Sequence, residues 1–553
     1  MALLERRIGL LFACFLGLLL LAAGRAAWLG TVKGGQLATA AASQQTASIA
    51  LPAQRGTIVD RRGIELAVSQ PAADVSATPY LVEDPVAAAK RLAPVLRKPA
   101  DQVVKQLARR DTGFAYLARA LPAERVEQIR RMRITGIQIT PGHRRFYPQS
   151  FLAAQVLGSV GTDGKGLAGL EYAANEQLTG RDGRRQLLKD ALGESIRVRD
   201  SRPMRPGSEL KLTIDAAIQE KVESVLGDVG RTYRPKGATA FVTDPRSGEL
   251  LALANWPRVD ANRPGAAPAY ATQNRAVGFT YEPGSTFKAF TVAGALEDGT
   301  VTPATTFDLP PQIQVADRVI GESHPRGPVT LSTGEVLAQS SNVGAVTIGL
   351  KMGKADFDRW VRRFGFGQRT GVDLPGEERG LVLPVAKYSG SSMGNLPIGQ
   401  GISVTPMQMA AAYGAIANGG MLRPPNLVGA IDGRPVAPPK GRRVISAGTS
   451  RKLREMLEGA FAPGGTASEV SIKNYVLAGK TGTANKIDPQ TGEYSNSRYI
   501  ASFIGFAPAL KPQLLIGVVV DEPNGAIYGG QVAAPAFERI ASFALPNLRI
   551  PPG

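Results

Sequence analysis

The sequence predicts an α+β fold, in which a mainly antiparallel sheet packs against helices, preceded by an N-terminal transmembrane helix and an elongated pedestal domain. Three observations support this expectation. Apolar, β-branched segments group near both ends of the second half of the chain, helical patterns lie between them, and the chain begins with an uninterrupted apolar run. The length of 553 residues and the hydrophobic content of 43% predict two or three domains with sizeable cores.

The apolar run extends from Ile8 to Gly24 and follows Arg6 and Arg7. Its length is at the short end of the range that spans a bilayer. A cleaved signal peptide is the alternative, favoured by small residues around 22–27, although its apolar region is normally shorter, about 7 to 15 residues. We expect residues 1–29 to form a cytoplasmic tip and a single uncleaved anchor in the plasma (inner) membrane, with the remainder outside the cytoplasm.

Two segments with different compositions follow the anchor. Residues 30–54 are rich in Ala, Gln, Ser and Thr and poor in large apolar residues, which predicts a stalk linker. Residues 55–206 mix short strands with helical stretches at 86–108 and 123–132, and no acid–base cluster stands out among them. We expect this second segment to be a pedestal.

Residues 207–553 are predicted to form the larger domain. It begins with a strand at 210–214, a helix at 216–229 and a hairpin of strands 237–242 and 249–254. It ends with strands at 475–484, 499–507 and 513–520, followed by a helix at 533–544 that Pro546 is expected to end.

Composition excludes several function classes. Cys14 lies within the apolar run, so the rest of the chain has no thiol for a disulfide, and export to an oxidising space is harmless. With His143 and His324 as the only histidines, we expect no metal site and no cofactor. The net charge of +19 comes from scattered basic groups without aromatic interleaving, which predicts a basic surface near anionic membrane or wall polymer and not a nucleic-acid site.

The first chemical motif is Ser285-Thr286-Phe287-Lys288. It follows a Pro-Gly pair and opens an apolar helical pattern, which predicts Ser285 at a helix N-terminus with Lys288 on the same face. A lysine in a dry cleft loses its proton readily, so Lys288 is the candidate general base for the Ser285 hydroxyl. Taken alone, the tetrad also fits a capping serine and a solvated lysine.

The second motif is Ser340-Ser341-Asn342, between helical patterns at 333–338 and 343–352. A hydroxyl at Ser340 suits proton relay to a leaving group. The Asn342 amide suits a substrate carbonyl and can also hold Lys288. A polar helix cap is the alternative use of these residues.

The third motif is Lys480-Thr481-Gly482-Thr483, at the end of an apolar strand. Its small residues let a substrate backbone approach the strand edge. Lys480 and the hydroxyls of Thr481 and Thr483 suit a carboxylate, and the backbone amides of Thr483 and Ser285 suit an oxyanion hole. The alternative is a glycine-containing turn with a surface lysine.

Two further patterns are expected to carry no chemistry. Residues 164–169 fit G-x-G-x-x-G, but no βαβ series follows, so we expect a turn and a helix start. Residues 390–394 fit G-x-S-x-G, but both histidines precede Ser392, so the usual order of serine, acid and histidine fails. We expect His324 to be a loop or surface residue and not a catalyst.

The three motifs, in this order, resemble the active-site motifs of the penicillin-binding proteins and serine β-lactamases. Further matches narrow the resemblance to class B penicillin-binding proteins: residues 55–63, 145–148, 169–171 and 178–180 resemble the N-terminal module of that class. Residues 274–277, 399–401 and 528–530 resemble the septal, cell-division type more than the elongation type. Arg62 departs from the pattern, since such proteins often carry Asn there.

The resemblance implies a penicillin-binding transpeptidase (serine β-lactamase-like) domain on a dimerisation-like pedestal. It implies a septal D,D-transpeptidase that cross-links peptidoglycan stem peptides and is the target of β-lactams. In that mechanism Ser285 is the nucleophile, Lys288 the base and Ser340 the proton relay; Asn342 orients the peptide, and the strand from Lys480 to Thr483 holds its carboxylate.

The implied partners are a polytopic glycan-polymerising glycosyltransferase and other division proteins in the membrane. Two alternatives remain open. A D,D-carboxypeptidase or β-lactamase-like hydrolase uses the same serine with water as the acceptor, and it needs a deacylating base that the sequence does not reveal. A non-catalytic division scaffold is disfavoured by three intact motifs.

Overall fold

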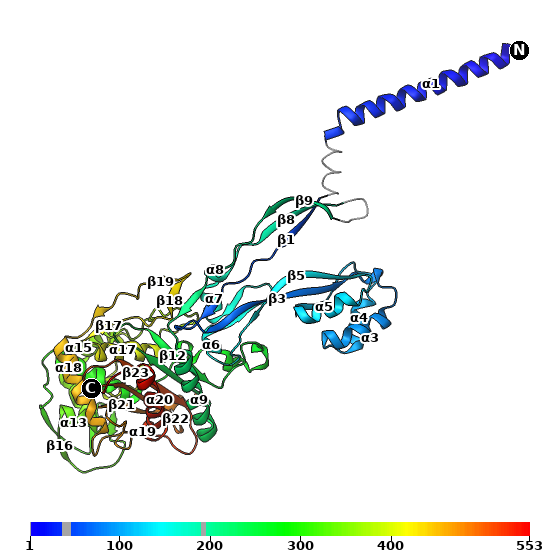
Figure 1. The fold of residues 1–553 in the computed structure, drawn as a ribbon. Coiled ribbons are helices and arrows are strands. Elements are labelled where there is room, and N and C mark those ends of the chain that lie inside the picture. The colour runs from blue at the N-terminus through cyan, green and yellow to red at the C-terminus, as the bar shows by residue number, and fades with distance from the viewer. Residues whose placement is uncertain (1, 36–45, 190–194, 553) are drawn as a thin grey trace.

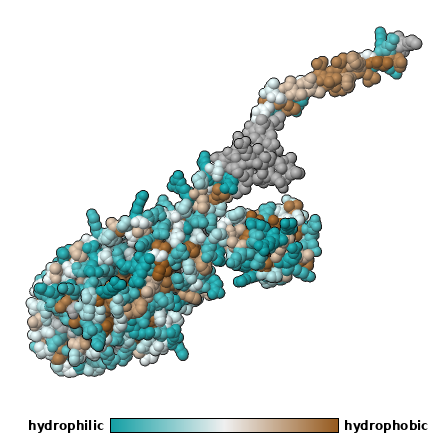
Figure 2. Space-filling model, viewed as in Figure 1, coloured by the Kyte–Doolittle hydropathy of each residue, from teal (hydrophilic) through white to brown (hydrophobic). Residues whose placement is uncertain are grey.

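The computed structural model describes residues 2–35, 46–189 and 195–552, which form an elongated molecule (Figure 1). Helix α1 (Ala2–Thr31) projects from one end. Its segment Leu4–Thr31 is long and apolar enough to cross a membrane, and none of it is buried against the rest of the chain. Figure 2 shows the predominantly apolar surface of this helix beside the mixed surface of the larger parts. The apolar run predicted from the sequence thus lies inside a longer helix.

A narrow antiparallel sheet lies between α1 and the rest of the molecule (Figure 1). It contains β1 (Thr46–Leu51), β8 (Gly183–Lys189) and β9 (Ser195–Arg202), in the order β1-β8-β9. The range expected to be a linker therefore contains a strand near its end, and that strand pairs with a segment distant in sequence.

The pedestal is built on the long strand β3 (Glu65–Ala77), which pairs with β4 (Ala115–Pro122) and β5 (Ile137–Phe146). Three helices pack with this sheet around one apolar cluster: α3 (Pro85–Leu96), α4 (Ala100–Leu107) and α5 (Ala123–Arg131). The helical stretch predicted over 86–108 forms two helices, because Arg97 ends α3 in the left-handed region at φ 54° and Pro99 precedes α4.

One sheet passes from the pedestal into the larger domain. Strand β2 (Ile58–Val59) pairs with β3 and with β10 (Leu210–Leu212), and β10 pairs with β18 (Val428–Ile431). The buried carboxylate of Asp60 accepts a hydrogen bond from the Ala216 N–H at 3.0 Å, at the start of α9 (Ala216–Tyr233). Pedestal residues therefore complete the first turn of a helix in the larger domain.

A buried ion cluster lies in the N-terminal motifs. The Glu171 side chain is fully buried, and its two oxygens accept hydrogen bonds at 2.6 Å from Arg55 Nε and Arg145 Nε. Arg145 also donates to the Gly56 carbonyl at 2.8 Å, and Arg55 donates to the Glu171 carbonyl at 2.6 Å. One carboxylate thus compensates two buried guanidinium groups and ties three distant segments together.

The larger domain contains a five-stranded antiparallel sheet in the order β12-β11-β23-β22-β21. These strands are β11 (Gly237–Thr243), β12 (Leu250–Trp256), β21 (Ala478–Ile487), β22 (Tyr494–Ala507) and β23 (Leu514–Asp521). The predicted hairpin and the three C-terminal strands are confirmed. In the part of the chain that the structure describes, β21 is an edge strand, so one side of its backbone is open for pairing.

Helices cover both faces of this sheet. Helices α9 and α20 (Ala534–Asn547) pack on one face around Val225, Phe503 and Phe537. Helices of the middle segment, including α12 (Lys288–Glu297) and α17 (Pro406–Ala417), belong to the core on the other face.

The predicted end of the C-terminal helix at residue 544 is wrong. Helix α20 continues through Pro546, because the Leu548 N–H still donates to the Ala544 carbonyl and closes the last turn.

Candidate active site

Ser285 lies in a tight 3₁₀ turn, Gly284–Phe287, that leads directly into α12. Gly284 has φ 54°, and a Cβ there would lie 2.9 Å from the Thr483 carbonyl oxygen, so glycine permits both the backbone conformation and the close approach of β21. The Gly284 N–H donates to the Gly399 carbonyl at 3.1 Å. The turn is thus held between the edge strand and the segment around Gly399, and the predicted helix N-terminus at Ser285 is confirmed in 3₁₀ form.

Lys288 is fully buried one turn after Ser285. Its Nζ donates to the Ser340 carbonyl at 2.6 Å, to Asn342 Oδ1 at 2.7 Å and to Ser340 Oγ at 3.2 Å. Burial lowers the pKa of Lys288 to about 7, although the negative charge of Glu322 opposes this effect. Only the protonated amine donates all three bonds; near neutral pH a large fraction of the amine is unprotonated, donates two of them and has a lone pair that can accept a proton, as a general base requires.

The second motif forms the turn between α13 (Thr333–Ala338) and α14 (Asn342–Met352). Ser340 has φ 61°, a left-handed conformation that is uncommon for a residue with a Cβ. Ser341 caps α14 by accepting a hydrogen bond from the Gly344 N–H at 2.9 Å. The sequence left helix capping and active-site chemistry as alternatives; the structure assigns capping to Ser341, while Ser340 and Asn342 contact Lys288.

The third motif lies in β21, next to Ser285. Lys480 is fully buried, and burial together with the charge of Lys288 lowers the pKa of Lys480 well below its usual range. Thr481 Oγ1 donates to Thr466 Oγ1 at 2.7 Å, and Thr483 Oγ1 accepts from the Gly529 N–H at 3.2 Å. The reading of this motif as a turn with a surface lysine is therefore wrong.

Gly482 makes the close packing around β21 possible. A Cβ at this position would lie 2.4 Å from Ser502 Oγ, 2.9 Å from Thr286 Cγ2 and 3.0 Å from the Pro283 carbonyl oxygen. The absence of a side chain lets the strand lie directly against the Ser285 turn.

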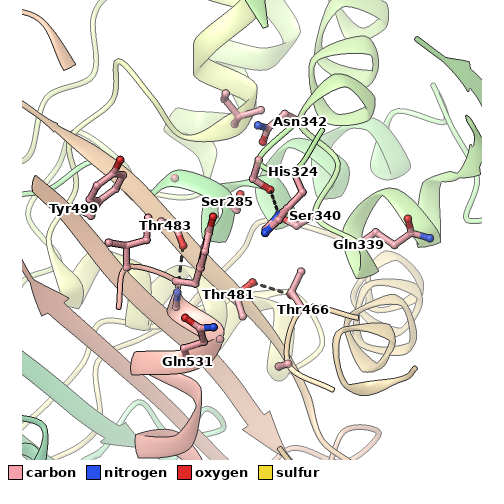
Figure 3. Close-up of a pocket in the computed structure, with 18 of the residues that line it drawn as sticks. Ser285, His324, Gln339, Ser340, Asn342, Thr466, Thr481, Thr483, Tyr499 and Gln531 are labelled. Atoms are coloured by element: carbon pink, nitrogen blue, oxygen red, sulfur yellow. Dashed lines mark hydrogen bonds between the residues drawn. The ribbon is translucent and has the colours of Figure 1, made fainter. Parts of the chain in front are cut away.

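A cavity of about 520 Å³ opens where the three motifs meet (Figure 3). Ser285, Ser340, Asn342, Thr481 and Thr483 line it. Lys288 and Lys480 are buried beside this cavity, at the motifs that form its walls. All three motifs predicted from the sequence therefore meet at one site, as expected.

The cavity also contains residues that sequence reasoning did not place at this site. His324 and Tyr528 line it from different segments, and their ring centroids lie 5.2 Å apart. Thr466 and Tyr499 line it as well (Figure 3). His324 lies in an exposed loop, as predicted, but that loop forms part of the cavity wall. Spatial proximity alone identifies His324, Thr466 and Tyr499, because no spacing pattern links them to the three motifs. Tyr528 belongs to the segment 528–530, whose resemblance to the septal type was seen in the sequence without a role in this cavity.

The two other sequence patterns lie outside this site. Gly164 follows β6 (Ser159–Val160) and precedes β7 (Gly166–Ala168), and a short helix begins at Gly169, so the predicted turn and helix start are confirmed. Ser392 begins a four-residue helix, Ser392–Asn395. Within the described ranges, no group of three or more His, Cys, Asp or Glu side chains has an arrangement that could hold a metal ion.

Comparison with known proteins agrees with the site. The family model described as penicillin binding protein transpeptidase domain matches residues 238–542, and the penicillin-binding protein dimerisation domain matches residues 50–212. Stage V sporulation protein D of Bacillus subtilis is 33% identical over 98% of this chain and 86% of its own length. Peptidoglycan D,D-transpeptidase FtsI of Escherichia coli K12 is 33% identical over 99% of this chain and 92% of its own length.

The chain also resembles solved structures over most of its length. Penicillin-binding protein 3 of Mycobacterium tuberculosis, in complex with aztreonam, has a TM-score of 0.71 and 31% identity, covering 91% of this chain and 98% of that chain. A peptidoglycan synthetase from Bifidobacterium adolescentis has a TM-score of 0.73 and 27% identity, covering 92% of this chain and 98% of that chain.

A serine on a tight turn, a buried lysine one turn later and a third motif on an adjacent edge strand define an acyl-serine enzyme of the penicillin-recognising class. The match of the dimerisation model to the N-terminal part argues against a simple β-lactamase. The chain belongs to the class B penicillin-binding proteins.

Proposed function

We propose that this protein is a membrane-anchored serine D,D-transpeptidase that cross-links peptidoglycan stem peptides through an acyl-enzyme on Ser285. The main observation behind the proposal is the environment of Lys288: its burial, its lowered pKa and its hydrogen bonds. It is buried one turn from Ser285, its pKa is lowered to about 7, and Ser340 and Asn342 hold its amine beside the cavity. These are the properties of a base prepared to activate a serine hydroxyl at neutral pH.

In the acylation step, Ser285 Oγ attacks the carbonyl between the two terminal D-alanines of a stem peptide, and Lys288 Nζ takes the hydroxyl proton. The bond to the last D-alanine then breaks, and Ser340 Oγ passes a proton from Lys288 to the departing amine. The 3.2 Å hydrogen bond between Lys288 Nζ and Ser340 Oγ supports this route. Among the described residues, the hydrogen bonds of Lys288 go to Ser340 and Asn342 and not to Ser285 Oγ, which is compatible with catalytic bonds that tighten only when substrate binds.

The edge strand β21 binds the peptide in this account. The substrate backbone pairs with the open edge, and Lys480, Thr481 and Thr483 hold its terminal carboxylate. Burial and the charge of Lys288 lower the pKa of Lys480, and an arriving carboxylate favours the charged amine, so binding and protonation of Lys480 are coupled. The backbone amides of Ser285 and Thr483 stabilise the oxyanion.

An amine from a second stem peptide then attacks the Ser285 ester, which forms the cross-link and releases the enzyme. β-Lactams imitate the D-alanyl-D-alanine end and leave a longer-lived ester on Ser285. Membership of the penicillin-binding family supports the amine as acceptor. A hydrolase would use water at this step.

The position of the protein in the cell is part of the proposal. The exposed apolar helix α1 supports a single anchor in the plasma membrane, with the N-terminus in the cytoplasm and the catalytic domain outside. We place the protein at the division site, beside a polytopic glycan-polymerising glycosyltransferase and other division proteins that contact the anchor and the pedestal. The resemblance of residues 274–277, 399–401 and 528–530 to the septal type supports this placement.

The test is to label the full-length protein in detergent with a fluorescent penicillin and map the adduct by peptide mass spectrometry. We expect one stable adduct on Ser285, no labelling of Ser285→Ala, and normal labelling of Ser468→Ala, which removes a different hydroxyl from the same cavity. Retained labelling of Ser285→Ala would refute the assignment of the nucleophile. Rapid loss of the adduct with turnover of the penicillin would favour a hydrolase.

A further inference from the structure

A buried carboxylate that does not line the cavity contacts the second motif, Ser340-Ser341-Asn342. Glu322 lies in the loop between β15 (Arg318–Gly321) and β16 (Val329–Ser332), and its side chain is only 7% exposed. Glu322 Oε1 accepts hydrogen bonds at 2.6 Å from Ser341 Oγ and from Arg326 Nη2. Glu322 Oε2 accepts a hydrogen bond at 2.6 Å from the Asn342 N–H.

We propose that Glu322 is a positioning residue for the acylation of Ser285: its carboxylate fixes the Ser340–Asn342 turn in contact with Lys288 and sets the electrostatic environment of that amine. This inference rests on the proposed function of the site and adds a residue that none of the three motifs contains.

The contacts explain how Glu322 acts through Asn342. Glu322 fixes the backbone of Asn342, while Asn342 Nδ2 donates to the Gly321 carbonyl at 2.9 Å. With its amide nitrogen used in this way, Asn342 presents Oδ1 to Lys288 Nζ, at 2.7 Å. The loop that contains Glu322 thus determines that the oxygen of the Asn342 amide, and not its nitrogen, faces the amine of Lys288.

The same contacts hold a strained turn. Ser340 has φ 61°, and its carbonyl and hydroxyl both accept hydrogen bonds from Lys288. A left-handed residue with a side chain persists only where its surroundings over-determine it. Glu322 bonds to the next two residues of the turn and so supplies part of that constraint.

Glu322 also affects Lys288 through its negative charge. Among the described residues, the titratable and charged groups near this amine are Lys480 of β21 and, from the loop, Glu322 with its partner Arg326; His324 lines the cavity beside them. The negative charge of Glu322 favours the protonated form of Lys288. Removing that charge will therefore lower the pKa of Lys288 further, and removing the cation Arg326 will raise it.

The experiment measures the second-order rate of Ser285 acylation by a fluorescent penicillin in the full-length protein between pH 5 and pH 9. In Glu322→Gln we expect the rate at high pH to fall by about 10-fold or more, since the turn loses a charge-assisted anchor. We also expect the inflection on the acid side to move to lower pH by about half a unit or more. Glu322→Asp keeps the charge, so its inflection stays in place while the rate falls less.

The matched control is Asp317→Asn, which removes the same charge from an exposed position in the turn between β14 (Gln312–Val315) and β15. Its rate and its inflection should equal those of the unchanged protein. If Glu322→Gln does not fold, as judged by circular dichroism, Arg326→Gln provides the test, with an inflection that moves to higher pH.

A Glu322→Gln profile that superimposes on that of Asp317→Asn would overturn the proposal, and so would a uniform loss of rate at every pH with no change of inflection. In the fallback, an unmoved inflection in Arg326→Gln would overturn it. Acylation of the unchanged protein tests the proposed function separately from this inference. If the unchanged protein is not acylated on Ser285, the proposed function is refuted, whereas the role of Glu322 is tested only by comparing the variants with the unchanged protein.

Discussion

The Lys288 amine donates a 2.6 Å hydrogen bond to the carbonyl of Ser340, a residue in the left-handed backbone region at φ 61°. This conformation turns both the carbonyl and the hydroxyl of Ser340 toward one amine. The strained turn and the buried amine are therefore one unit, and a change in either will affect the other.

The rate of Ser285 acylation should depend on pH through Lys288. Burial lowers the pKa of Lys288 to about 7, and only the unprotonated amine accepts the Ser285 proton. The rate should therefore rise with pH through an inflection near 7 and fall as the amine becomes protonated below it. Stopped-flow or quenched labelling with a fluorescent penicillin measures this profile, and an inflection near the pKa of a free lysine would contradict it.

Replacing Lys288 by methionine removes the base while keeping most of its apolar volume. We expect acylation to fall by about 100- to 10,000-fold, the usual contribution of a general base. Lys351→Met is the control, because Lys351 is an exposed lysine in the last turn of α14. Equal rates in the two variants would exclude Lys288 as the base.

Adding a methyl group at Gly482 should disturb the contact between β21 and the Ser285 turn. A Cβ there would lie 2.4 Å from Ser502 Oγ and 3.0 Å from the Pro283 carbonyl. We expect Gly482→Ala to slow acylation by about 10-fold or more, since misplacement of reacting groups by about 1 Å has large effects on rate. Gly448→Ala, at an exposed position in a helix with its nearest neighbour atom at 3.8 Å, should acylate normally. Normal acylation of both variants would show that the close approach at Gly482 is dispensable.

The carboxylate of Glu171 should be essential for stability. It is fully buried between Arg55 and Arg145, so Glu171→Gln leaves buried guanidinium charge uncompensated. The free energy of unfolding should decrease by about 3 to 5 kcal/mol. Glu127→Gln breaks exposed pairs with Arg130 and Arg131 and should cost about 1 kcal/mol or less. Denaturant titration measures both, and similar losses in the two variants would refute this role.

Helix α1 should be the membrane anchor. Its apolar surface is unburied, so deletion of residues 2–31 should abolish co-flotation with phospholipid vesicles. The rate of Ser285 acylation should not change, because the site lies in the distant larger domain (Figure 1). Cys14→Ser changes one atom within the helix and should float as the full-length protein does. Vesicle binding by the deletion variant would point to a second membrane-binding surface.

Sequence reasoning located the three motifs of the candidate site because local chemistry determines their secondary structure. Pro-Gly punctuation before Ser285, helical patterns on both sides of residues 340–342 and an apolar strand before Lys480 each indicate a defined local structure. That the three motifs meet at one cavity could be predicted because their order resembles that of a known family. The hairpin at 237–254 could likewise be predicted from its turn residues.

The remaining features depend on distant contacts. Glu322 has no special spacing from Lys288, and its role appears only when the loop packs on α14. The ring contact between His324 and Tyr528 joins residues far apart in the chain. Helix α20 continues past Pro546 because backbone hydrogen bonds close its last turn, which no local rule predicts. Such contacts are set by tertiary packing, and a single sequence carries little trace of them.

The most direct test of the account supplies the full-length protein with a donor peptide ending in D-alanyl-D-alanine and an amine acceptor. Mass spectrometry then quantifies the cross-linked product against the hydrolysed donor. The account predicts cross-linked product as the main outcome, release of D-alanine, and loss of both in Ser285→Ala but not in Ser468→Ala. Hydrolysed donor alone, or product formed by Ser285→Ala, would contradict it.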